Sequence, residues 1–140
     1  MPQHTSRLRV GLVDPFTLSR ESLAFVLQED YQDIQVVFLA CNASDAMARL
    51  APGLVDVLVI SDYLGDTEPD GFTLAATIRD RLSYPPIVIA TASTGHMTDP
   101  ELGPARAAEA GAWGYLDAGR VPPEGLATAI RQAAAGSPYR

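Results

Sequence analysis

Residues 57–63 read Val-Leu-Val-Ile-Ser-Asp-Tyr, four apolar side chains followed directly by a short polar group. An unbroken apolar run rich in β-branched residues is typical of a strand that is covered on both faces of a parallel sheet. The stretch therefore predicts a buried strand over Val57–Ile60, with Asp62 just beyond its carboxyl end.

Four more apolar runs occur along the chain, and helical patterns separate them. The runs are Leu8–Val13, Ile34–Ala40, Ile87–Ala90 and Gly114–Leu116. The helical patterns are Leu18, Leu23, Val26 and Leu27 on one expected face, Ala43–Leu50 after a cap at Asn42 or Ser44, Phe72 with Leu74 and Ile78, and Pro123–Ala135 before Gly136. Strict alternation of strand and helix implies right-handed crossovers and one doubly wound sheet.

The number of strands decides between the two common doubly wound topologies. Five strands in 140 residues favour a three-layer, flavodoxin-like α/β domain, with a parallel sheet in the order 2-1-3-4-5, over a Rossmann-like fold. In that order the ligand crevice lies at the carboxyl ends of strands 1 and 3. We expect one domain over residues 8–136, with residues 137–140 as a tail or the start of a linker.

Composition narrows the class of protein. Hydrophobic residues make up 47% and charged residues 19% of the chain, as in an ordinary globular protein. The net charge of −7 and the pI of about 4.6 argue against nucleic-acid binding by this chain. There is no apolar run of about 20 residues for a membrane span and no secretory signal pattern, so a cytoplasmic protein is expected. A single cysteine excludes an intramolecular disulfide.

Polar side chains gather where the crevice is expected. Asp14 follows the first strand, Asp62 the third and Thr91 the fourth, and Tyr115 lies in the fifth. Taken singly, each has an ordinary structural explanation as a turn former, a helix cap or a half-buried aromatic. Two carboxylates at the switch point of the sheet favour a functional site.

These residues resemble those of the bacterial response-regulator receiver domains. The resemblance rests on the order and spacing of Leu-Val-Asp at 12–14, Ile-Ser-Asp-Tyr at 60–63, Asp-Gly-Phe at 70–72, Thr-Ala at 91–92 and Gly-Ala-Trp-Gly-Tyr-Leu at 111–116. It implies that Asp62 accepts a phosphoryl group, that Thr91 and Tyr115 are switch residues, and that Asp14 and Asp62 hold a weak Mg²⁺ site. Such a protein is a signalling domain and not an enzyme. At most, it catalyses the transfer of a phosphoryl group onto itself.

The last helix, ending Ala-Ile-Arg-Gln-Ala-Ala-Ala-Gly at 129–136, is similar to that of the NarL-type branch. The partners that this implies are a histidine kinase or phosphotransfer protein, a second copy of the chain in a homodimer, and a DNA-binding output domain missing from these 140 residues.

The chain departs from the family pattern at two charged positions. Pro15 replaces the second acid after the first strand, and Ala118 stands where the family carries a lysine. Losing one charge about 4 Å from a cation, at an effective dielectric constant of about 20, forfeits up to about 4 kcal/mol before desolvation is counted. Arg120 is a candidate replacement for the lysine, and Asp66, Glu68 or Asp70 for the acid, although solvated side chains are the simpler interpretation. Pro100 and Gly103-Pro104 should break or shorten the helix before the fifth strand.

Two functions therefore compete. One is a phosphorylation-dependent receiver domain; the other, which we favour for the mechanism, is a pseudo-receiver that binds partners without phosphoryl chemistry. A flavodoxin-like enzyme or flavin binder is disfavoured because no glycine-rich phosphate loop follows a strand. His4 and His96 are too few and too far apart for a zinc site or a catalytic triad.

Overall fold

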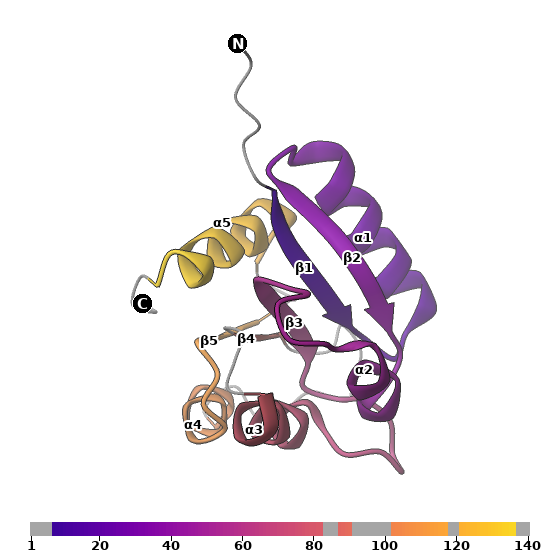
Figure 1. The fold of residues 1–140 in the computed structure, drawn as a ribbon, viewed down its shortest axis with the longest axis vertical. Coiled ribbons are helices and arrows are strands. Elements are labelled where there is room, and N and C mark those ends of the chain that lie inside the picture. Colours follow the sequence, from indigo (N-terminus) through magenta and orange to yellow (C-terminus); the bar gives the residue numbers. More distant parts are fainter. Residues whose placement is uncertain (1–6, 83–86, 91–101, 118–120, 137–140) are drawn as a thin grey trace.

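The computed structural model describes residues 7–82, 87–90, 102–117 and 121–136. In this part of the chain strands and helices alternate (Figure 1). The strands are β1 (Leu8–Val13), β2 (Ile34–Ala40), β3 (Val57–Ser61), β4 (Ile87–Ala90) and β5 (Gly114–Leu116). The helices are α1 (Thr17–Asp30), α2 (Ala43–Arg49), α3 (Gly71–Leu82), α4 (Gly103–Glu109) and α5 (Pro123–Ala134).

All pairings in the sheet are parallel, and the strands lie in the order β2-β1-β3-β4-β5. The order in which successive strands are added to the sheet therefore reverses between β1 and β3. These two strands pair from Val10 beside Val57 to Val13 beside Ile60. The predicted flavodoxin-like α/β class with a parallel sheet is confirmed.

Helices cover both faces of the sheet, which gives three layers (Figure 1). One core cluster joins α1 and α5 to Val57 and Val59, and the other joins α2, α3 and α4 to Leu58 and Ile60. Because successive side chains of a strand point to opposite faces, Ser61 follows Val59 toward α1 and α5. Asp62 follows Leu58 and Ile60 toward the other layer.

Helix ends follow from local chemistry. The Asn42 side chain accepts a hydrogen bond of 2.8 Å from the backbone N–H of Asp45, which caps α2. Helix α4 begins at Gly103, has Pro104 in its first turn and spans only seven residues. This agrees with the predicted shortening; Pro100 lies outside the described residues.

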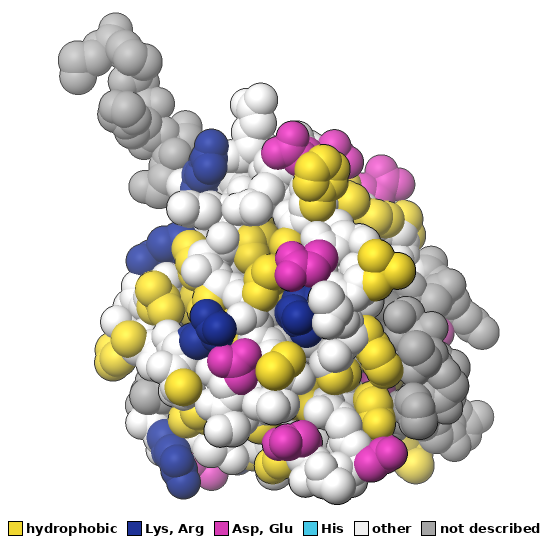
Figure 2. Space-filling view, turned by 90° about the vertical axis from the view of Figure 1, so that its right-hand side faces the viewer, with side chains coloured by type: hydrophobic (Ala, Val, Ile, Leu, Met, Phe, Trp, Pro, Cys, Tyr) yellow, Lys and Arg dark blue, Asp and Glu magenta, His cyan; other side chains and the backbone are white. Residues whose placement is uncertain are grey.

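The face predicted for the first helix is wrong at Leu18. Leu18 is 81% exposed, whereas Leu27 is fully buried against the sheet. The two residues are nine positions apart, which at about 100° per residue places them on opposite sides of α1. On the side of the molecule that carries α1, hydrophobic and charged side chains are interspersed (Figure 2). None of the described helices has the length and apolar character needed to cross a membrane.

A paired ion bridge ties α5 to the start of β2. The guanidinium of Arg131 donates hydrogen bonds of 2.7 and 2.8 Å to the two carboxylate oxygens of Asp33. This hydrogen bonding lowers the pKa of Asp33 below its ordinary value of 3.8. A carboxyl whose folded pKa is depressed stabilises the fold above its unfolded pKa and loses that contribution as the pH falls through the folded pKa.

We therefore expect the urea midpoint to fall as the pH drops from about 5 to about 3, and Asp33→Asn to make that fall smaller. The bridge is half exposed, so its contribution should be at most about 1 kcal/mol. The matched control is Asp80→Asn, at a carboxylate that is 69% exposed and paired only with its chain neighbour Arg79 among the described salt bridges; it should leave the bridge between α5 and β2 intact. An identical pH dependence in wild type and Asp33→Asn would contradict the assignment.

Candidate functional site

Asp62 lies at the carboxyl end of β3 and is only 3% exposed. Its backbone carbonyl accepts a hydrogen bond of 2.9 Å from the N–H of Gly71, the first residue of α3. A Cβ atom at position 71 would lie 2.1 Å from the carbonyl oxygen of Ser61. The close approach of α3 to the end of β3 therefore requires glycine there, and it fixes the backbone that carries Asp62.

The hydroxyl of Tyr115 donates to Asp62 Oδ2 across 3.3 Å. This is longer than the roughly 2.5–3.0 Å usual between oxygens, so the contact is a weak one. Burial, together with the negative charge of Asp62, raises the pKa of Tyr115, which keeps the phenol protonated as a donor. Tyr115 is 5% exposed, and a Cβ atom at Gly103 would lie 2.4 Å from its ring. The glycine that begins α4 thus makes room for the inward ring.

A cationic side chain from α4 stands over this aromatic layer. The ring of Phe72 stacks on Tyr115 at a centroid distance of 6.1 Å, and the guanidinium of Arg106 lies 4.2 Å from the Phe72 centroid. Arg106 also bridges Asp70 at 2.9 Å. Although burial opposes it, hydrogen bonds from Thr73 and Arg106 lower the pKa of Asp70. Sequence reasoning missed Arg106, because nothing local in α4 indicates that it reaches the loop after β3.

Two of the acids considered as replacement ligands already have partners. Asp70 accepts the backbone N–H of Thr73 at 2.8 Å and so caps the first turn of α3. Asp66 accepts the hydroxyl of Tyr63 at 2.8 Å. Asp66 and Asp70 are therefore held in local contacts of the loop and of the first turn of α3.

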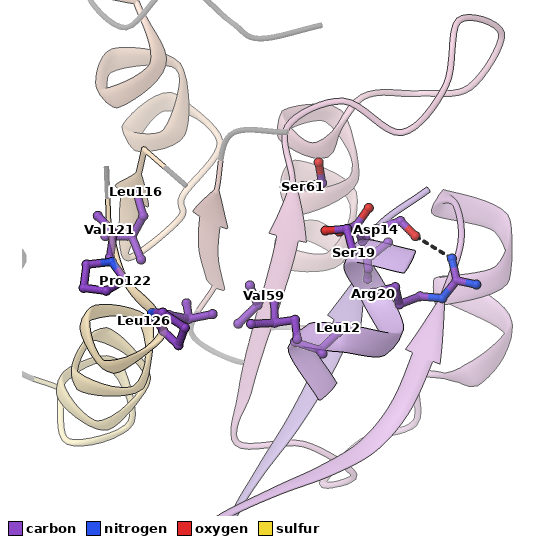
Figure 3. A pocket seen from close by; sticks show the side chains of 13 residues that line it. Leu12, Asp14, Ser19, Arg20, Val59, Ser61, Leu116, Val121, Pro122 and Leu126 are labelled. Carbon is purple, nitrogen blue, oxygen red and sulfur yellow. Dashed lines mark hydrogen bonds between the residues drawn. The ribbon is translucent and has the colours of Figure 1, made fainter. Parts of the chain in front are cut away.

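Asp14 lies at the same edge of the sheet as Asp62, but its carboxylate is hydrogen-bonded to residues at the start of α1. Its Oδ1 accepts the backbone N–H of Phe16 at 2.8 Å, and its Oδ2 accepts the hydroxyl of Ser19 at 2.7 Å. One step beyond the pairing of Val13 with Ile60, the register places Asp14 beside Ser61. Its carboxylate lines a cavity on the α1–α5 side of the sheet (Figure 3), and Asp62 does not line that cavity.

These residues do not fit a strong Mg²⁺ site. Within the described ranges, no group of three or more His, Cys, Asp or Glu side chains is placed to hold a metal ion. Pro15 has no ligand atom in its side chain, and both oxygens of Asp14 accept hydrogen bonds from the start of α1. Mg²⁺ demands near-octahedral oxygen ligands around one or two carboxylates, so this edge offers fewer acids than the family pattern.

The fold of this chain is similar to that of several solved response-regulator structures. A two-component response regulator of the LuxR family from Aurantimonas sp. SI85-9A1 is 28% identical, with a TM-score of 0.81, over 95% of this chain and 89% of that chain. The response regulator ChrA of a heme-sensing two-component system is 28% identical, with a TM-score of 0.73, over 94% of this chain and 59% of that chain. The receiver domain of the putative response regulator NarL from Mycobacterium tuberculosis shares the fold at 23% identity and a TM-score of 0.78, over 94% and 98% of the two chains.

The structures that this chain resembles in fold are response regulators and their receiver domains. No protein-family model and no curated protein matches it. The structure brings Asp62 and Tyr115 together, whereas Thr91, Ala118 and Arg120 lie outside the described residues.

Proposed function

We propose that this receiver domain serves two-component signalling as a protein-interaction module, and that its Asp62 is a poor phosphoacceptor. The observation that carries the proposal is the missing second acid beside Asp14. Pro15 supplies no carboxylate, and hydrogen bonds from Phe16 and Ser19 already use one lone pair on each oxygen of Asp14. The cation that phosphoryl transfer needs to neutralise the equatorial oxygens is therefore poorly held.

The surroundings of Asp62 support the same conclusion. The carboxylate is buried at 3% exposure and contacts the Tyr115 hydroxyl. A phosphoryl group on Asp62 would have to displace that hydroxyl and would place close to two negative charges at the edge that also carries Asp14.

The alternative is a phosphorylation-dependent receiver domain in which Tyr115 is the switch residue and Thr91 binds the phosphoryl oxygens. It is favoured by the position of Asp62 at the carboxyl edge and by the inward ring of Tyr115. Under either proposal the domain spans residues 8–136, is cytoplasmic, and meets a histidine kinase or phosphotransfer protein, with a homodimer and a DNA-binding output domain as further partners.

Titration with Mg²⁺ distinguishes the interaction module from the phosphorylation-dependent receiver domain. We expect no saturation at low-millimolar Mg²⁺ in Trp113 fluorescence or in ¹H–¹⁵N spectra, and no further shifts when beryllofluoride is added as a phosphoryl mimic, because Asp14 and Asp62 alone offer too few ligands. Asp62→Asn is the matched control. Saturable shifts around Asp62 and Tyr115 that this substitution abolishes would overturn the proposal in favour of the phosphorylation-dependent alternative.

A further inference from the structure

A cavity of about 260 Å³ opens between α1 and α5 at the carboxyl edge of the sheet (Figure 3). The floor comes from β1 and β3, and the walls come from α1, the end of β5 and the start of α5. Most of the lining is apolar, with side chains of Leu12, Leu23, Val59, Leu116, Val121 and Leu126. Neither Asp62 nor Tyr115 lines this cavity.

A buried hydroxyl without a partner lines this cavity. Ser61 is 7% exposed, and its Oγ has no hydrogen-bond partner in the part of the chain that the structure describes. Buried polar side chains are nearly always hydrogen-bonded. Ser61 ends an otherwise apolar strand, where alanine or valine would bury no polar atom. The hydroxyl therefore points to a partner that the described residues do not provide.

The second polar group in the cavity is the pair of Asp14 and Ser19. Each oxygen of the Asp14 carboxylate accepts one hydrogen bond, from the Phe16 N–H or from the Ser19 hydroxyl, and keeps a further lone pair. Arg20 also lines the cavity, and its guanidinium donates to the backbone carbonyl of Asp14 at 2.8 Å (Figure 3). A carboxylate that needs donors disfavours an anionic ligand and favours one with an O–H group.

We propose that this cavity binds a small, neutral, mainly apolar alcohol or phenol, with its hydroxyl held between Ser61 and Asp14. The size follows from the volume: a cavity of ~150 Å³ takes up benzene, and pockets for drug-sized ligands start at about 300 Å³. At about 260 Å³ the cavity suits a ligand of two fused rings. The proposal is independent of phosphorylation at Asp62.

The test compares two probes of one shape, 2-naphthol and naphthalene, by ¹H–¹⁵N titration of the full chain. We expect saturable shifts at Leu12, Ser61 and Leu126 with 2-naphthol. Ser61→Ala should weaken 2-naphthol about tenfold, the value of one hydrogen bond, and leave naphthalene unchanged. Leu23→Trp, which fills the cavity, should abolish binding of both probes. Ser22→Ala, on α1 outside the cavity, should change neither.

Thermal unfolding tests whether Ser61→Ala loses 2-naphthol binding merely because it is less stable. Ser61→Ala removes a buried hydroxyl that has no partner within the described ranges, so its Tm should be equal to that of the wild type or a few degrees higher. The proposal is overturned if 2-naphthol shows no saturable shift, which would indicate a cavity that holds water only. It is also overturned if Ser61→Ala binds 2-naphthol as tightly as the wild type, or if the shifts map away from α1, β3 and α5.

Discussion

Treated with acetyl phosphate, the protein is expected to stay almost entirely unmodified, whereas the double variant Pro15→Asp with Ala118→Lys is expected to gain one phosphoryl group. The two substitutions restore the acid after β1 and the cation after β5 that the family pattern contains. Intact-mass spectrometry measures the modified fraction directly.

The expected difference is large because the charges act at short range. An aspartyl phosphate carries close to two negative charges, and one unit charge at about 4 Å and a dielectric constant of about 20 changes the energy by about 4 kcal/mol. Even half of that corresponds to more than tenfold in the equilibrium. The added carboxylate holds Mg²⁺ and the added ammonium pairs with the phosphoryl group, so both lower the cost of the modified state.

The matched control is Asp62→Asn, placed in the wild type and in the double variant. It should remove the mass gain from the double variant, which would assign the modification to Asp62. An efficient gain of one phosphoryl group on the wild type, lost in Asp62→Asn, would contradict the pseudo-receiver proposal. If the double variant folds but gains nothing, the missing charges are not the defect.

The strands and the starts of α2 and α5 could be predicted because their causes are local. The run Val57–Ile60 is buried on both faces, and such a strand shows in the sequence as unbroken hydrophobicity. The Asn42 cap and the proline that begins α5 act within one helical turn. Features of this kind depend on near neighbours in the chain, which the sequence displays.

The site could be predicted only in outline, because its contacts are tertiary. The sequence predicts that Asp14 and Asp62 lie at one edge of the sheet. It does not predict the hydrogen bonds that hold the Asp14 carboxylate at the start of α1. Arg106 meets Asp70 across 36 positions of the chain. The Ser61 hydroxyl has no partner among the described residues, and this depends on the side chains of several elements that are distant in the sequence. Only strand alternation could have indicated that Ser61 and Asp62 face different layers.

Gly71→Ala is expected to destabilise the fold by roughly 2–4 kcal/mol, through overpacking and a strained hydrogen bond. The new Cβ atom would lie 2.1 Å from the carbonyl oxygen of Ser61 and 3.0 Å from Cα of Asp62. Both neighbours are backbone atoms, so no side-chain rotation relieves the clash. The start of α3 must move away from β3, which weakens the hydrogen bond from the Gly71 N–H to Asp62 and displaces the carboxylate.

Urea unfolding compares this variant with Gly53→Ala, which separates crowding from backbone strain. Gly53 has a φ of +77°, and a Cβ atom there would meet nothing within 4 Å. Its substitution should cost only the left-handed backbone penalty of roughly 1–2 kcal/mol. The Gly71 variant should lose more stability and, in ¹H–¹⁵N spectra, shift the signals of Ser61, Asp62 and Tyr115, while the Gly53 variant should leave those signals in place. Equal stability losses, or an unperturbed Asp62 signal in Gly71→Ala, would show that the contact between α3 and β3 does not hold the position of Asp62.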